Sequence, residues 1–168
     1  MKRKIYVVST THWDREWYST FQQYRFRLVR MLDDLIDNME KYPEYKYFHL
    51  DGQTIVLDDY LRIRPQNKSR LEKLIKDGRI FIGPWYCMPD EFLISGEGLV
   101  RNLQKGREIC DSFDTEPMKN GYVCDIFGHN TQMPQIFKNF GMNSAGLFRG
   151  VGSYGKDTFL WEGADGTR

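Results

Sequence analysis

The sequence lacks an excess of charge of either sign. Its 168 residues carry 24 Lys and Arg against 23 Asp and Glu, a formal net charge of +1. Proteins that bind nucleic acids or anionic membranes by electrostatics show a marked basic surplus, so this balance argues against both kinds of partner. No apolar run approaches the length needed to cross a bilayer. We therefore expect neither nucleic acid nor membrane among the partners.

Cysteine is scarce and scattered. Cys87, Cys110 and Cys124 form no Cys-x-x-Cys pair, and an odd, dispersed set is typical of reduced thiols in a cytosolic protein. The N-terminus is basic at residues 1–4, but the apolar segment that follows is too short for a signal peptide. These two features predict a cytoplasmic protein.

The apolar periodicity alternates between strand-like and helix-like along the chain. The run Ile5–Val8 is β-branched and bounded by polar residues, which predicts a buried strand. Spacings of three and four among the apolar residues of 18–40 predict a helix closed by Pro43. The other expected strands are 45–50, 79–82, one at Tyr122, 145–148 and one starting at 159–161, and the other expected helices are 69–76, 98–112 and 134–140.

Alternating strands and helices predict an α/β fold with a parallel sheet and right-handed crossovers. No repeat, low-complexity tract or linker divides the chain, so residues 1–168 read as one compact domain. In such folds the sites form at the carboxyl ends of the strands. Polar residues follow the expected strands in just this way: His12, Asp14, Asp51, Asp90, Asp125 and Arg149.

The segment 12–17, HWDREW, is the most informative stretch of the chain. Residues i and i+2 of an extended segment point to the same side, so His12 and Asp14 aim an imidazole and a carboxylate at one point. These two ligand types suit Zn²⁺ and similar divalent cations. A surface turn with solvated charges is the alternative reading of this pair.

A second stretch, 121–130, is a short strand that ends in a carboxylate, Asp125, followed by Gly-His-Asn. By itself Asp125 is better interpreted as a strand-end turn residue or a helix N-cap than as a catalytic residue. Taken with three other segments, it makes the chain resemble the bacterial α-mannosidases of glycoside hydrolase family 38. The segments that carry the resemblance are HWDREW at 12–17, GPWYCMPDE at 83–91, CDIFGH at 124–129 and the weaker LFRG at 147–150.

The resemblance implies roles for particular residues. Asp125 would be the catalytic nucleophile, and His12, Asp14 and Asp125 would bind one Zn²⁺ or another divalent cation. Trp17 and Trp85 would face the sugar, Arg149 would lie near the nucleophile, and Asp90 is a further candidate substrate-binding residue. Simpler readings place Trp85 in the core, leave Asp90–Glu91 in a solvated loop and have His129 bond loop backbone.

The resemblance also implies the fold, an incomplete seven-stranded β/α barrel that forms the N-terminal part of a catalytic domain. Family members are much longer, and a further metal-binding histidine and the general-acid aspartate would lie downstream of residue 168. We therefore expect these residues to be inactive alone. A sheet stopped short leaves an exposed edge, so we expect the piece to form a homo-oligomer or to pack against the rest of the enzyme.

The implied activity is retaining, metal-dependent hydrolysis of α-mannosidic bonds in a mannose-containing oligosaccharide or mannoside. Plain, phosphorylated and glycerate-linked mannosides all remain open as substrates. A metal-dependent carbohydrate deacetylase is an alternative, because it shares the barrel type and the His/Asp metal chemistry. A non-catalytic sugar- or metal-binding domain is another.

Overall fold

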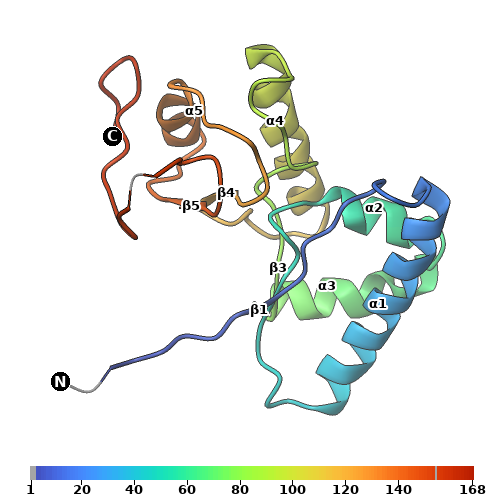
Figure 1. Cartoon of the computed structure of the whole chain (residues 1–168). Helices are drawn as coiled ribbons and strands as arrows, with labels where there is room; N and C mark the ends of the chain where they lie inside the picture. The colour runs from blue at the N-terminus through green and yellow to red at the C-terminus, as the bar shows by residue number, and fades with distance from the viewer. Residues whose placement is uncertain (1–2, 154) are drawn as a thin grey trace.

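The computed structural model of the chain describes residues 3–153 and 155–168. Strands and helices alternate in it, and the strands form two parallel sheets with the orders β1-β2-β3 and β4-β5 (Figure 1). A bridge between Gln53 and Trp85 continues the pairing beyond β2 and β3. The strands are β1 Ser9–Thr10, β2 Phe48–His49, β3 Ile80–Phe81, β4 Gly121–Val123 and β5 Ala145–Leu147. A mixed α/β fold with parallel sheets is thus confirmed.

The helices lie close to their expected positions, with one addition. The amphipathic stripe of 18–40 forms the longest helix and buries one face, from Tyr24 to Met39. A helix that the periodicity did not predict, α2, follows β2 directly and is almost wholly buried. The helices are α1 Phe21–Lys41, α2 Ile55–Leu61, α3 Lys68–Lys76, α4 Gly96–Ser112 and α5 Met133–Asn139, with a 3₁₀ turn at Pro65–Asn67.

Two apolar clusters hold these elements together. The first packs α1, α2 and α3 against β2 and β3, and the second joins α4 and α5 to β4. Trp85 belongs to the second cluster, and its indole Nε1 donates a hydrogen bond of 2.9 Å to the carbonyl of Tyr122. Trp85 thereby connects the segment after β3 to the next strand. No helix among the described residues is long and apolar enough to span a membrane.

Two expected strands are wrong. Ile5–Val8 is not a buried strand: these side chains are 61–87% exposed and form an arm that extends from β1 (Figure 1). β1 is an edge strand of its sheet, and among the described residues nothing covers the apolar run beside it. Residues 159–161 form no strand, because Trp161 instead packs its ring against those of His129 and Phe137.

Candidate active site

The ends of β1, β2 and β4 bring four polar side chains together. His12 and Asp14 follow β1, Asp51 follows β2, and Asp125 follows β4. The parallel register of β1 and β2 puts their carboxyl ends at the same edge of the sheet. This edge is where side chains of a parallel sheet converge into sites, as the sequence predicts.

His12 is the centre of the cluster. Its Nε2 lies 2.8 Å from Oδ2 of Asp125 and 3.6 Å from Oδ1 of Asp14. One nitrogen and two carboxylate oxygens from these residues lie within 4.8 Å of one another. The donor set is one imidazole and two carboxylates, which fits Zn²⁺ or a similar divalent cation.

The other nitrogen of the His12 ring is held by a buried carboxylate. Nδ1 lies 2.9 Å from Oδ2 of Asp51, a residue with no exposed surface. The same oxygen accepts a hydrogen bond from the Trp13 backbone N–H at 2.9 Å and one from Nε2 of Gln53 at 3.0 Å. A carboxylate behind a ligating histidine sets its tautomer and ring orientation. Asp51 therefore leaves Nε2 of His12 free to bind a cation.

The charges of three nearby carboxylates act on the His12 ring. Burial acts to lower its pKa, but the charges of Asp51, Asp14 and Asp125 act the other way, and the net result is a raised pKa. A cation at Nε2 would require the neutral ring. The carboxylates of Asp14 and Asp125 would then interact with the cation instead of with the ring proton.

A second set of metal-capable atoms surrounds Nδ1 of His12, where the thiol of Cys124 joins Asp51. Burial raises the pKa of Cys124 to about 11, so the thiol keeps its proton. Metals bind the thiolate rather than the thiol. Oδ2 of Asp51 already serves three donors, and the Cys124 thiol donates to Oδ1. The outer set, with Asp14 and Asp125, is therefore the better metal site.

Arg149 lies beside Asp125, where the resemblance placed it. Its Nη2 is 2.7 Å from Oδ1 of Asp125, an ion pair without hydrogen-bond alignment. The guanidinium also sits over the ring of Phe127, 5.2 Å from the ring centroid. Phe127 is 73% exposed, and sequence reasoning did not single it out. Its place two residues after Asp125 is the signal that would have drawn attention to it.

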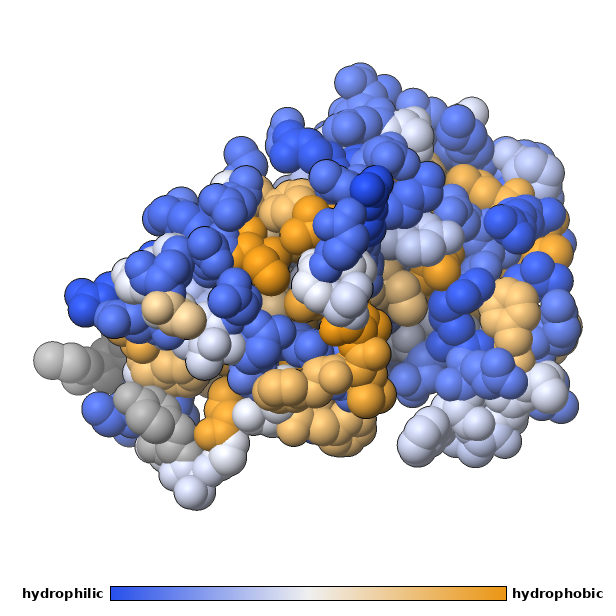
Figure 2. Space-filling view, turned by 90° about the horizontal axis from the view of Figure 1, so that it is seen from above, coloured by the Kyte–Doolittle hydropathy of each residue, from blue (hydrophilic) through white to orange (hydrophobic). Residues whose placement is uncertain are grey.

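A cavity of about 450 Å³ opens at this cluster. His12, Asp125 and Arg149 line it together with Phe148 and Leu147. The wall thus combines charged groups with apolar surface, as ligand sites commonly do. Exposed apolar side chains also interrupt the hydrophilic surface elsewhere on the molecule (Figure 2).

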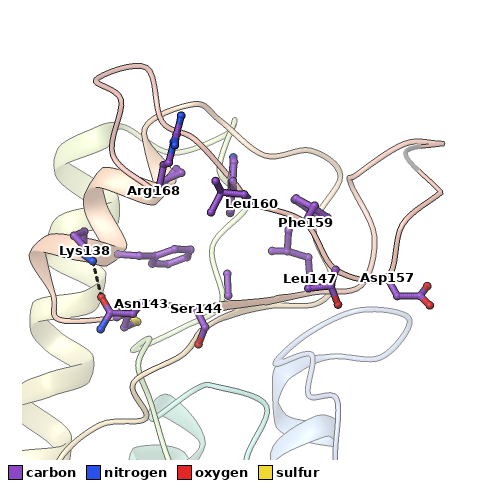
Figure 3. Close-up of a pocket in the computed structure, with 14 residues that line it drawn as sticks. Lys138, Asn143, Ser144, Leu147, Asp157, Phe159, Leu160 and Arg168 are labelled. Carbon is purple, nitrogen blue, oxygen red and sulfur yellow. Dashed lines mark hydrogen bonds between the residues drawn. The ribbon is translucent and has the colours of Figure 1, made fainter.

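A separate cavity of about 300 Å³ lies between α5 and residues 157–161 (Figure 3). Lys138 is one of its polar residues, and its Nζ donates to Oδ1 of Asn143 at 2.8 Å. Arg168 is another, and it is paired with Glu162. Neither His12 nor Asp125 reaches this cavity, so we assign the chemistry to the cluster at the strand ends.

Not every expected site residue lies at the cluster. Trp85 has no exposed surface and is a core residue, so its ring is not available to a sugar. Trp17 is 74% exposed, and its role in sugar binding stays a prediction. Asp90 accepts a hydrogen bond from the Phe92 backbone N–H at 3.2 Å, as a turn residue does. Glu91 is not solvated: it is buried and bonds His129.

Known proteins resemble this chain both in sequence and in structure. Residues 2–168 match the family described as "Glycosyl hydrolases family 38 N-terminal domain". The chain belongs to glycosyl hydrolase family 38. The segments 12–17 and 124–129 that meet at the candidate site both lie within this match, which runs over nearly the whole chain.

Family 38 relatives are similar along most of this chain. A Halalkalibacterium halodurans protein named "Putative mannosylglycerate hydrolase" is 39% identical and covers 100% of this chain and 20% of its own length. The crystal structure of an α-mannosidase from Enterococcus faecalis V583 is 42% identical, with a TM-score of 0.83, over 86% of this chain and 16% of its own. A second Enterococcus faecalis structure, of a protein in glycosyl hydrolase family 38, is 38% identical with a TM-score of 0.81. It covers 96% of this chain and 18% of its own length. The chain thus spans a fifth or less of each relative's length.

Proposed function

We propose that this chain forms the N-terminal part of the catalytic domain of a retaining, metal-dependent α-mannosidase, folded as part of an incomplete seven-stranded β/α barrel. The observation that carries the proposal is the convergence of His12, Asp14 and Asp125 on one point, with Arg149 against Asp125, in a family 38 chain. The names of similar proteins, α-mannosidase and mannosylglycerate hydrolase, support a mannoside as substrate.

Asp125 is the proposed nucleophile. One of its oxygens forms a bond to the anomeric carbon while the glycosidic C–O bond breaks and the departing oxygen takes a proton from a general acid. Water then hydrolyses the ester between Asp125 and the sugar, and the configuration is retained. Arg149 holds the attacking carboxylate in place and balances its charge.

His12, Asp14 and Asp125 would hold one Zn²⁺ or another divalent cation. When bound, such an ion orients sugar hydroxyls and stabilises charge at the reacting centre. Asp51 fixes the His12 ring so that Nε2 faces the two carboxylates. Phe127 and Trp17, both largely exposed, offer flat apolar surface for the sugar.

The test uses the full-length protein with p-nitrophenyl α-mannoside and a glycerate-linked mannoside. Asp125→Ala should abolish turnover, because loss of a nucleophile removes the whole reaction path. Asp37→Ala is the matched control, since Asp37 is an exposed carboxylate that pairs with Arg70 on the surface. A fluorosugar that traps glycosyl-enzymes should label a peptide containing Asp125. Labelling of another peptide, or release of acetate from an acetylated sugar, would overturn the proposal.

Residues 1–168 alone should be catalytically silent. Glu91 is buried against His129 and Asp90 is bound in a turn, so neither is free to protonate a leaving group. Without a general acid, about 10²–10⁴-fold in rate is lost. Purified residues 1–168 with Zn²⁺ should therefore show no turnover of p-nitrophenyl α-mannoside, while calorimetry with mannose and Zn²⁺ tests the non-catalytic binding alternative. A cytoplasmic location and self-association stay predictions.

A further inference from the structure

Three loops that follow consecutive strands are joined through one buried pair of side chains. Glu91 lies in the loop after β3, His129 in the loop after β4, and Arg149 directly after β5. Nδ1 of His129 lies 3.0 Å from Oε1 of Glu91, and its Nε2 lies 3.0 Å from the backbone oxygen of Arg149. Oε2 of Glu91 accepts a further hydrogen bond of 2.8 Å from the Asn130 backbone N–H. The imidazole therefore bridges the first loop to the third.

The chemistry of the acceptors defines the direction of these bonds. A backbone carbonyl can only accept, so Nε2 of His129 must carry a proton and donate it to Arg149. Nδ1 and the carboxyl of Glu91 then share one further proton. Since a Glu carboxylate only accepts, the ionised form of the pair has both ring nitrogens donating. Every polar atom of the two side chains has a partner in this arrangement.

The two side chains of the pair are largely buried. The side chains of His129 and Glu91 are 8% and 0% exposed, and the ring of Trp161 lies edge to face against His129 at 5.3 Å. Gly150, with φ of +86°, lets the loop after β5 lie close to the loop after β4. A Cβ at this position would lie 3.0 Å from the Gly128 nitrogen and 3.1 Å from Nε2 of His129. Only glycine allows the third loop to come this close in this conformation.

We propose that Glu91 and His129 are positioning residues that hold the backbone of Arg149, so that its guanidinium stays against the nucleophile Asp125. The chain of contacts runs from Glu91 through His129 to the Arg149 carbonyl, and from the Arg149 side chain to Asp125. Neither positioning residue touches Asp125 or the metal-capable cluster. The inference rests on the proposed function, because it assumes that Arg149 supports Asp125 as the nucleophile.

The test is a double-mutant cycle in the full-length protein. His129→Phe keeps an aromatic ring against Trp161 but removes both hydrogen bonds, and should lower kcat/KM by about 10²-fold through misplacement of Arg149. Arg149→Ala removes the group being positioned. If His129 acts through Arg149, adding His129→Phe to Arg149→Ala should cost no further activity. The inference would be overturned if the losses of the two single variants multiplied in the double variant. It would also be overturned if His129→Phe left kcat/KM unchanged.

If His129→Phe fails to fold, two variants of Glu91 provide the same test. Glu91→Gln can donate its amide to Nδ1 of a neutral imidazole and accept from Asn130 with its oxygen, so kcat/KM should stay within about threefold of the wild type if only the geometry matters. Glu91→Ala removes the anchor and should behave like His129→Phe. Equal activity of the alanine and glutamine variants would count against the proposal, and Arg101→Gln on the surface of α4 is the neutral control.

A measurement without turnover separates this inference from the proposed function. Hydrogen–deuterium exchange of residues 147–151 should rise in Glu91→Ala and stay unchanged in Glu91→Gln, while bound Zn²⁺ is equal in both. If the wild type hydrolyses no mannoside, the proposed function fails, but this exchange pattern still tests whether the pair holds the third loop. Unchanged exchange in Glu91→Ala would overturn the inference even in an active enzyme.

Discussion

His12 and Asp51, 39 residues apart in the chain, meet at 2.9 Å between Nδ1 and Oδ2. Asp51 has no exposed surface, whereas the His12 side chain is 39% exposed and its Nε2 lies near Asp14 and Asp125. The buried carboxylate thus orients an imidazole whose other nitrogen points to the open cluster. This relationship links the core of the domain to the proposed metal site.

Asp51→Asn should weaken zinc binding while leaving the three proposed ligands in place. The amide oxygen cannot serve the His12, Trp13 and Gln53 donors as the charged carboxylate does, so the ring loses its fixed orientation. We expect the zinc dissociation constant to rise by about 10- to 100-fold, measured by competition with a chromophoric chelator. Asp37→Asn, at an exposed carboxylate, is the control, and equal affinities for wild type and Asp51→Asn would contradict the assignment.

Removal of the metal should abolish activity reversibly. Treatment of the full-length protein with a chelator should eliminate mannoside hydrolysis, and added Zn²⁺ should restore it. His12→Ala should lower metal content and activity together, because a site with only two carboxylates left binds a cation weakly. Metal content is measured by mass spectrometry after dialysis. Full occupancy in the double variant His12→Ala, Asp14→Ala would show that the metal binds elsewhere.

The two tryptophans should separate stability from substrate binding. Trp85→Ala leaves a large hole in the second apolar cluster and an unpaired carbonyl at Tyr122, and should reduce the free energy of unfolding by about 3–5 kcal/mol. Trp17→Ala, at an exposed side chain, should change it by no more than about 0.5 kcal/mol and raise KM instead. Urea unfolding and steady-state kinetics measure the two effects. A stable Trp85→Ala variant would contradict the core assignment.

The Glu91–His129 pair should make part of the stability depend on pH. Burial acts to lower the pKa of His129, but the hydrogen bond to Glu91, the bond to the Arg149 carbonyl and the Glu91 charge outweigh it, and the pKa is raised. The stabilisation is therefore fully present below the unfolded value of about 6.5 and is lost as the pH rises through the higher folded value. The unfolding free energy of the wild type relative to Glu91→Gln should be larger in mildly acidic than in alkaline buffer. A pH-independent difference would argue against an ionised pair.

The local pattern of the sequence already contained the alternation of elements and most of their positions. Apolar spacing predicted α1, α3, α4 and α5 within a few residues, because a helix face is encoded in residues three and four apart. The placement of Asp125 after a strand followed from the same local reading, as did the family motifs. His12 and Asp14 also follow a strand, but that strand is Ser9–Thr10 and not the expected Ile5–Val8. These features depend on neighbours in the chain, and the sequence alone was sufficient for them.

The tertiary structure decided what depends on residues far apart in the chain. Ile5–Val8 has the composition of a buried strand, but burial needs a covering surface, and none lies over it among the described residues. Trp85 became core because β4 and α5 close over its ring. Asp51 behind His12, and Glu91 beside His129, are contacts across 39 and 38 residues. No local period encodes such pairs: they arise only when the fold brings the carboxyl ends of parallel strands together.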